Sequence, residues 1–197
     1  MAHITMIGGG ALIRPLAVLS TRAGHSILRI DDAGSDTASC SHSDMIIVAG
    51  DRTALAELIR RVASVARPDA VVIDATTSVE DEQAHGAEDL VSEGEWISLL
   101  PSLRVVRAFA SVPVEAFMVI VDQTSTPRLF ELAVPMAGDD VSAKERVAEF
   151  MRQVGVKPFD LGPLTVSYVM DPGGSLWDKA LDLAELVECV GWLSGDG

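Results

Sequence analysis

A glycine turn near the start of the chain is the feature best suited to chemistry. Gly8, Gly9 and Gly10 follow the short apolar run 3–7 and precede the helical pattern of residues 11–23. Glycines in such a turn let the backbone approach a pyrophosphate, and the N-terminus of the next helix offers N–H groups to the anion. The spacing therefore predicts a turn that binds the pyrophosphate of a dinucleotide.

The residues after this turn depart from the pattern G-x-G-x-x-G. Ile13 stands where the third glycine would allow the helix to pack closely on the first strand. We expect this branched side chain to push the helix away or to displace the turn. Leu12, Ile13 and Arg14 still fall where the first helical turn would meet a phosphate, and Arg14 either contacts that phosphate or is solvated. The start of the chain thus predicts the fold and leaves nucleotide binding open.

Two carboxylates follow the second predicted strand, at residues 26–30. Asp31 and Asp32 stand where a dinucleotide-binding unit places the residue that meets the adenosine ribose. A carboxylate there accepts a hydrogen bond from the ribose 2′-hydroxyl and repels a 2′-phosphate. If a dinucleotide binds, NAD is therefore expected to bind better than NADP. The alternative is that both aspartates merely begin a solvated loop.

Polar and small residues end the next two predicted strands. Ala49 ends the third strand and Gly50 follows it, and Thr76 follows the fourth strand. Ligands of open parallel sheets bind outside the carboxyl ends of the strands. We therefore expect these three residues to border the cofactor.

Three side chains are candidates for catalysis, and each has a structural alternative. Asp74, at the end of the fourth strand, either acts on a ligand or fixes its own loop by a hydrogen bond. Tyr168 is the only tyrosine, and it either donates a hydrogen bond in a cleft or packs with its hydroxyl satisfied. Asp171 acts as a base or caps the helix that follows.

The elements that must position these residues alternate along the chain. Apolar runs predict strands at residues 3–7, 26–30, 45–49, 70–73, 103–109 and 156–160, and helical spacing predicts helices at 11–23, 52–66, 79–100 in part, 142–154 and 175–193. This alternation favours an α/β fold with a Rossmann-like, doubly wound parallel sheet. We expect one compact unit over residues 1–197, with a dinucleotide-binding core at 1–110 and a C-terminal α/β extension at 111–197 that forms cleft and dimer contacts.

Taken in order, several short motifs resemble the NADP oxidoreductases that use the deazaflavin coenzyme F420. Beside the glycine turn, the motifs are Ala23-Gly24-His25, Val72-Ile73-Asp74-Ala75-Thr76, Leu100-Pro101, Arg104 to Phe109, Ala137-Gly138-Asp139-Asp140 with Ala143-Lys144, and Phe159 to Leu164. The resemblance implies hydride transfer between a nicotinamide and a small organic substrate or the deazaflavin, in a homodimer. In such enzymes the cofactors carry the redox chemistry and the protein orients them.

The loops that would face the cofactor depart from this family together. Ala49-Gly50-Asp51 replaces an apolar-proline turn, Thr77-Ser78 replaces Asn-Pro, and Ala110 replaces an asparagine. Two interpretations therefore stay open. The chain is an NAD(P)-dependent reductase with altered specificity, or it is a pseudo-oxidoreductase that binds a metabolite or promotes a non-redox cyclisation or isomerisation in a biosynthetic pathway. A non-catalytic partner subunit is a third alternative.

Composition narrows the partners. The formal net charge of −14 argues against nucleic acid, because such a surface repels phosphate backbones. Cys40 and Cys189 show no pairing pattern, and no metal-ligand spacing is visible, so we predict a reducing cytoplasm and no metal. No apolar run approaches the roughly 20 residues of a membrane span.

Leucines and tryptophans lie on several faces of the predicted terminal helix, and this pattern predicts a homodimer. Apart from a second copy of the chain, the expected partner is a small-molecule substrate.

Overall fold

The computed structural model describes residues 1–31, 37–77, 103–122 and 131–193. One seven-stranded sheet runs through these residues in the order β2-β1-β3-β4-β5-β6-β7. Its strands are β1 (His3–Ile7), β2 (Ser26–Ile30), β3 (Met45–Val48), β4 (Val71–Asp74), β5 (Arg104–Ala108), β6 (Ala133–Gly138) and β7 (Lys157–Asp160). Each of the six predicted strands lies within one residue of the bounds of its counterpart, whereas β6 was not among the predicted strands.

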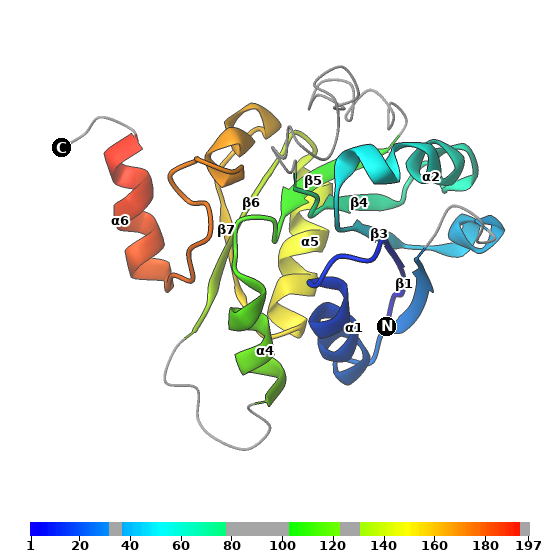
Figure 1. Ribbon diagram of the computed structural model, residues 1–197, viewed down its shortest axis with the longest axis horizontal. Coiled ribbons are helices and arrows are strands. Elements are labelled where there is room, and N and C mark those ends of the chain that lie inside the picture. The colour runs from blue at the N-terminus through cyan, green and yellow to red at the C-terminus, as the bar shows by residue number, and fades with distance from the viewer. Residues whose placement is uncertain (32–36, 78–102, 123–130, 194–197) are drawn as a thin grey trace.

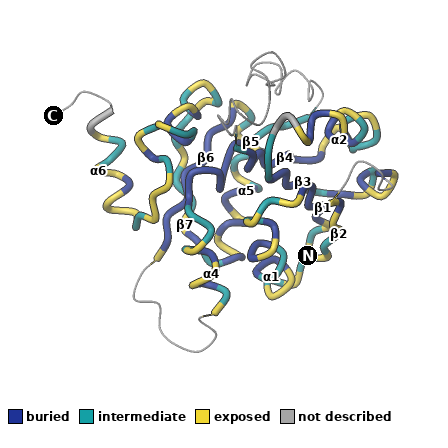
Figure 2. Tube along the Cα trace, in the orientation of Figure 1, coloured by how far each residue is buried: buried dark blue, intermediate teal, exposed yellow. Residues whose placement is uncertain are grey.

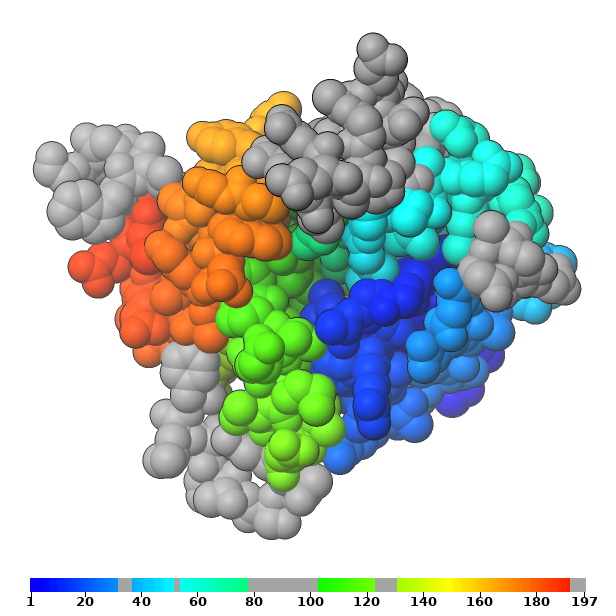
Figure 3. All heavy atoms as spheres, in the orientation of Figure 1, coloured from blue at the N-terminus to red at the C-terminus, as the bar shows by residue number. Residues whose placement is uncertain are grey.

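The sheet is parallel except at one junction. β1 to β5 run parallel to one another, whereas β6 is antiparallel to β5 and parallel to β7. The α/β, Rossmann-like architecture is therefore confirmed, and β6 and β7 extend the sheet in the reverse direction. Figure 3 shows the blue-to-cyan N-terminal residues gathered on one side and the orange-to-red C-terminal residues on the other.

Helices cover both faces of the sheet (Figure 1). They are α1 (Ile13–Arg22), α2 (Arg52–Val65), α4 (Val114–Asp122), α5 (Val141–Gln153) and α6 (Leu183–Leu193), with short 3-10 helices η1 (Ala38–His42) and η2 (Leu164–Met170). One apolar cluster joins α1, α4 and α5 to the sheet, a second lies under α2, and a third lies under η2 and α6. The predicted helix at 79–100 lies outside the described residues.

Alternation along each strand explains these clusters. In β3, Met45 and Ile47 face the α1–α5 cluster, whereas Ile46 and Val48 face α2. Strands buried on both faces must be apolar throughout, as parallel strands covered by helices usually are. Figure 2 shows this buried centre, and it shows α6 largely exposed at one end of the molecule.

The terminal helix is shorter than the sequence pattern predicts. α6 begins at Leu183, whereas the pattern predicts a helix from residue 175. The backbone N–H of Ala133 donates to the carbonyl of Leu181 at 2.8 Å. This bond forms an isolated bridge between Leu181 and strand β6, and the segment before α6 does not join the helix.

Candidate functional site

The turns after β1 and β3 pack backbone against backbone at the carboxyl edge of the sheet. Because β2 lies on one side of β1 and β3 on the other, this is where the strand order reverses, the place where open α/β sheets bind ligands. Gly8 has φ +101°, and a Cβ on it would lie 2.2 Å from the Ala49 carbonyl oxygen. A Cβ on Gly10 would lie 3.1 Å from the backbone of Ala49 and Gly50. The fold therefore requires glycine at position 8, whereas a side chain at position 10 would make the two turns shift by a few tenths of an ångström.

A pocket of about 380 Å³ opens beside these turns. Its lining residues come from the glycine turn, the end of β2, the turn after β3 and α2: Gly9, Gly10, Asp31, Gly50, Asp51, Ala54, Leu55 and Leu58. Asp31 is paired with Arg29 (Nη2 to Oδ1 3.1 Å), and Asp51 accepts a hydrogen bond from the Ala54 N–H. Two carboxylates line this pocket, and no basic residue is found among its lining residues that the structure describes.

No side chain caps the first turn of α1, in which the Ile13 N–H donates to the Gly10 carbonyl at 3.0 Å and Pro15 has no N–H. Leu12 stands at the N-cap without a side-chain hydrogen bond, and no acidic residue lies in the first turn. By contrast, Asp51 caps α2 and Asp140 caps α5. An uncapped helix N-terminus beside a glycine turn suits an anion. The exposed Arg14 adds a cation to the same turn.

Ile13 does not occupy this pocket. Its side chain is fully buried in the cluster under α1, together with Ile4, Met6 and Leu16. The branched side chain therefore replaces the third glycine by filling space between helix and sheet. The turn itself stays free of it.

The structure brings only part of the predicted cofactor set together. Gly9, Gly10, Asp31 and Gly50 line one pocket, with Gly8 and Ala49 packed at its base. Leu12 packs on the core cluster, and Asp32 lies outside the described residues. Thr76 is fully buried, and its hydroxyl donates to Asp74 Oδ1 at 2.6 Å, so it does not face the pocket.

A second cluster of charges lies farther along the same edge, centred on Arg107. This side chain is fully buried, and it is the register partner of Asp74 on the neighbouring strand. Its Nη1 donates to Asp74 Oδ2 at 3.0 Å, and its Nη2 donates to Asp171 Oδ1. The cluster therefore joins β4 and β5 to the segment that follows η2.

Two of the three candidate catalytic residues belong to this cluster, and the third does not. Asp74 also accepts hydrogen bonds from the Thr76 N–H and hydroxyl, so its carboxylate is engaged by its own loop and by Arg107. Asp171 pairs with Arg107 and does not cap the helix that follows it in the chain, because α6 begins only at Leu183. Tyr168 is 62% exposed and is not part of this cluster.

Arg107 was not among the site residues predicted from the sequence, although one feature of the sequence indicated it. The strand Arg104-Val105-Val106-Arg107-Ala108 carries an arginine inside an otherwise buried run. A buried guanidinium requires carboxylate partners. Asp74, which ends the neighbouring strand, could supply such a carboxylate.

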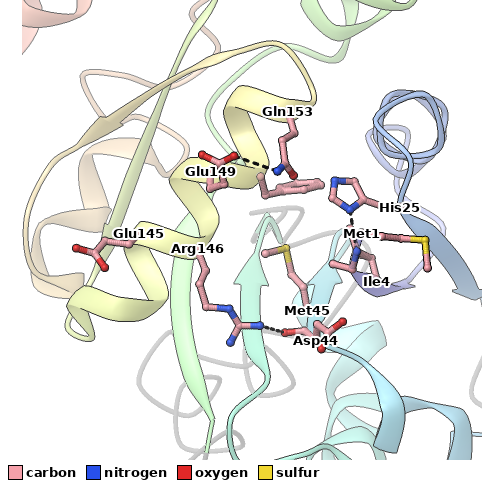
Figure 4. Close-up of a pocket in the computed structure, with 11 residues that line it drawn as sticks. Met1, Ile4, His25, Asp44, Met45, Glu145, Arg146, Glu149 and Gln153 are labelled. Carbon is pink, nitrogen blue, oxygen red and sulfur yellow. Dashed lines mark hydrogen bonds between the residues drawn. The ribbon is translucent and has the colours of Figure 1, made fainter.

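A second pocket, of about 350 Å³, lies at the opposite, amino edge of the sheet (Figure 4). Arg146 donates to the backbone carbonyls of Asp69 and Asp44, both at 2.8 Å. His25 Nδ1 accepts from the Ala2 N–H at 3.2 Å, and burial lowers the pKa of its imidazole. Arg146 thus serves the chain's own backbone, and so does His25 through its Nδ1.

No metal site or membrane span is found in the part of the chain that the structure describes. None of these residues form a group of three or more metal-ligating side chains. No described helix is long and apolar enough to cross a bilayer.

Comparison with known proteins identifies the architecture. The sequence matches no protein-family model and no curated protein. A hypothetical protein from Sinorhizobium meliloti is similar in structure, with a TM-score of 0.71 and 20% identity, over 92% of this chain and 96% of its own. The chain has a Rossmann-like fold. A proposed F420-dependent NADP reductase from Arthrobacter sp. FB24 shares this fold with a TM-score of 0.65 and 18% identity, over 85% of this chain and 87% of its own.

The same Rossmann-like fold occurs in longer dehydrogenases. Prephenate dehydrogenase from A. aeolicus, solved with hydroxyphenyl propionate and NAD+, is similar with a TM-score of 0.55 and 17% identity. The similarity covers 86% of this chain and 63% of the dehydrogenase. The fold is therefore one that reductases and dehydrogenases of nicotinamide cofactors use.

Proposed function

We propose that this chain binds NAD at the pocket beside the glycine turn and transfers a hydride between its nicotinamide and a small organic substrate or a deazaflavin. The observation that carries the proposal is the uncapped start of α1 beside a turn whose glycines are packed on the turn after β3. The Ile13 N–H is bonded to the Gly10 carbonyl and Pro15 has no N–H, so Arg14 would meet the pyrophosphate through its own N–H and guanidinium. Asp31 would accept from the adenosine ribose. NAD supplies the redox chemistry when bound, whereas the protein orients it and excludes water.

The charge of the pocket supports NAD over NADP. Asp31 and Asp51 both line it, and a 2′-phosphate would meet their negative charge. One unfavourable contact of this kind is worth on the order of 1–2 kcal/mol, or roughly tenfold in affinity. Calorimetric titration with NADH and NADPH tests the proposal: NADH should bind about tenfold more tightly, and Asp31→Asn should narrow the difference. Tighter binding of NADPH would refute this preference.

The position of Ile13 supports binding at the turn. Because its side chain is fully buried in the core, the pyrophosphate does not compete with it for space. Ile13→Gly should therefore destabilise the protein without improving affinity for NADH. A gain in affinity in this variant would favour a wild-type turn that Ile13 blocks.

A second candidate is a pseudo-oxidoreductase that uses the same pocket for a metabolite or for a non-redox cyclisation or isomerisation. Ala110 favours it, because this small apolar residue follows β5 where the resembling family places an asparagine. Titration of the wild type separates the two candidates. Absence of binding to NADH, NADPH and coenzyme F420 would favour the second.

We also propose that the chain forms a homodimer through α6. Leu183 and Val187 lie one helical turn apart and are 45% and 53% exposed, whereas Leu186 is buried. A paired apolar stripe on an exposed helix suits a partner helix. Light scattering at micromolar concentration should give about twice the monomer mass of 20.9 kDa, and the monomer mass would exclude the dimer.

A further inference from the structure

One buried hydroxyl on the carboxyl edge has no partner. Ser111 lies three residues beyond β5 and is 1% exposed. Its Oγ makes no hydrogen bond within the part of the chain that the structure describes. A buried hydroxyl without a partner is costly, so proteins usually supply one from the chain, a water or a ligand.

The backbone around Ser111 is held in strained conformations. Phe109 has φ +68°, and its buried ring lies against Phe117 and Phe150, with centroids 5.8 and 6.2 Å away. Asp178 has φ +54°. Phe109 and Asp178 are the two described residues other than glycine with positive φ. A backbone hydrogen bond joins the segments that carry them: the Lys179 N–H donates to the Ser111 carbonyl at 3.2 Å. Strain of this kind persists where the surroundings enforce it and is common at ligand sites.

Ser111 lies on the path that a dinucleotide would follow from the glycine turn. The loops along the carboxyl edge touch in succession: Gly10 packs on Ala49, the Thr77 N–H donates to the Gly50 carbonyl at 3.0 Å, and β5 comes next in the sheet. From β1 to β5 there are three strand spacings of about 4.8 Å each, or roughly 14 Å. An extended dinucleotide covers that span, with its adenosine on the β2 side and its nicotinamide over β4 and β5.

We infer that the Ser111 hydroxyl binds the carboxamide of the nicotinamide, an inference that rests on the proposed function. A carboxamide presents both an acceptor and a donor, and a serine hydroxyl can complement either one. Because Ser111 is 1% exposed, the nicotinamide would reach its hydroxyl only through a local shift, and the segment that carries Asp178 and Lys179 is bonded to the Ser111 carbonyl.

The test compares two ligands and two serines. NAD+ and ADP-ribose share the adenosine and the pyrophosphate, and only NAD+ carries the nicotinamide. Ser20 is the matched control, because it is also fully buried with an unpartnered Oγ among the described residues, but it lies on α1. By calorimetry, Ser111→Ala should weaken NAD+ binding about tenfold and leave ADP-ribose binding unchanged. Ser20→Ala should alter neither affinity.

The outcomes separate the two proposals. If the wild type binds ADP-ribose but Ser111→Ala leaves the ratio of NAD+ to ADP-ribose affinity unchanged, the assignment of Ser111 is overturned and the cofactor site remains. If the wild type binds neither ligand, the proposed function fails and the assignment of Ser111 fails with it. Thermal unfolding of both variants checks the fold, because removal of an unpartnered buried hydroxyl should leave the midpoint unchanged or raise it.

Discussion

The two edges of the sheet carry pockets of similar volume, about 350 Å³ at the amino edge and about 380 Å³ at the carboxyl edge, but their polar groups are used differently. At the amino edge, Arg146 and His25 bond to the backbone of their own chain. At the carboxyl edge, the pocket is lined by glycine backbone and by the end of β2, beside an uncapped helix. Volume alone therefore does not identify a site, whereas the availability of hydrogen-bonding groups does.

Arg107 is the exception at the carboxyl edge, since its charge is engaged by two carboxylates of the chain. Arg107→Met should lower the free energy of unfolding by about 4 kcal/mol, because Asp74 and Asp171 would lose their buried partner. Urea denaturation measures the loss. Arg104 is the matched control on the same strand, with a side chain that is 40% exposed and paired with Asp140 at 3.2 Å. Arg104→Met should cost less than about 1 kcal/mol. Equal losses in both variants would contradict the structural role of Arg107.

An alanine in the glycine turn should destabilise the protein at position 8 and be tolerated at position 9. Gly8→Ala should cost about 3 kcal/mol, since the new Cβ would meet the Ala49 carbonyl in a left-handed backbone. A Cβ on Gly9 meets nothing within 4 Å, so Gly9→Ala should change stability by less than about 1 kcal/mol. Denaturant midpoints of the two variants decide the point. A tolerated Gly8→Ala would show that the turns after β1 and β3 are not packed as described.

The fold could be predicted from the sequence because its signals are local. The buried run of β3 and the glycine turn each mark an element within a few neighbouring residues. Contacts between distant residues left no such mark. Asp171 pairs with Arg107 across 64 positions, and Leu181, bonded to Ala133, lies before a terminal helix that begins later than expected. The sequence likewise named Ile13 as a departure but could not show whether its side chain faced the core or the turn.

The affinity for NADH should be more sensitive to an alanine at position 10 than to one at position 9. A Cβ on Gly10 would sit 3.1 Å from the Ala49 and Gly50 backbone, so Gly10→Ala must shift the turn by a few tenths of an ångström. The same Cβ would also hinder the approach of a pyrophosphate, and the affinity for NADH should fall about tenfold. Gly9→Ala should keep affinity within about threefold of the wild type. Equal affinities in calorimetry would place the nucleotide away from this turn.

The smallest expected effect belongs to the amino edge and concerns pH. Burial lowers the pKa of His25 in the folded protein below its ordinary value of 6.5. Between the folded pKa and 6.5, the unfolded chain then binds more protons than the folded one, so the free energy of unfolding falls as pH decreases. The stability that this difference in the pKa of His25 contributes is fully present above pH 6.5 and is lost as the pH falls below that value.

The variant His25→Asn isolates this contribution. Asparagine keeps an acceptor for the Ala2 N–H, whose bond to Nδ1 is 3.2 Å long, but it does not titrate. Urea denaturation between pH 5 and 8 should therefore show a smaller loss of stability towards low pH in the variant than in the wild type. NADH affinity should stay unchanged at each pH where both proteins are folded, because His25 lines the pocket at the amino edge. A variant that loses NADH affinity would break the separation between a structural edge and a binding edge.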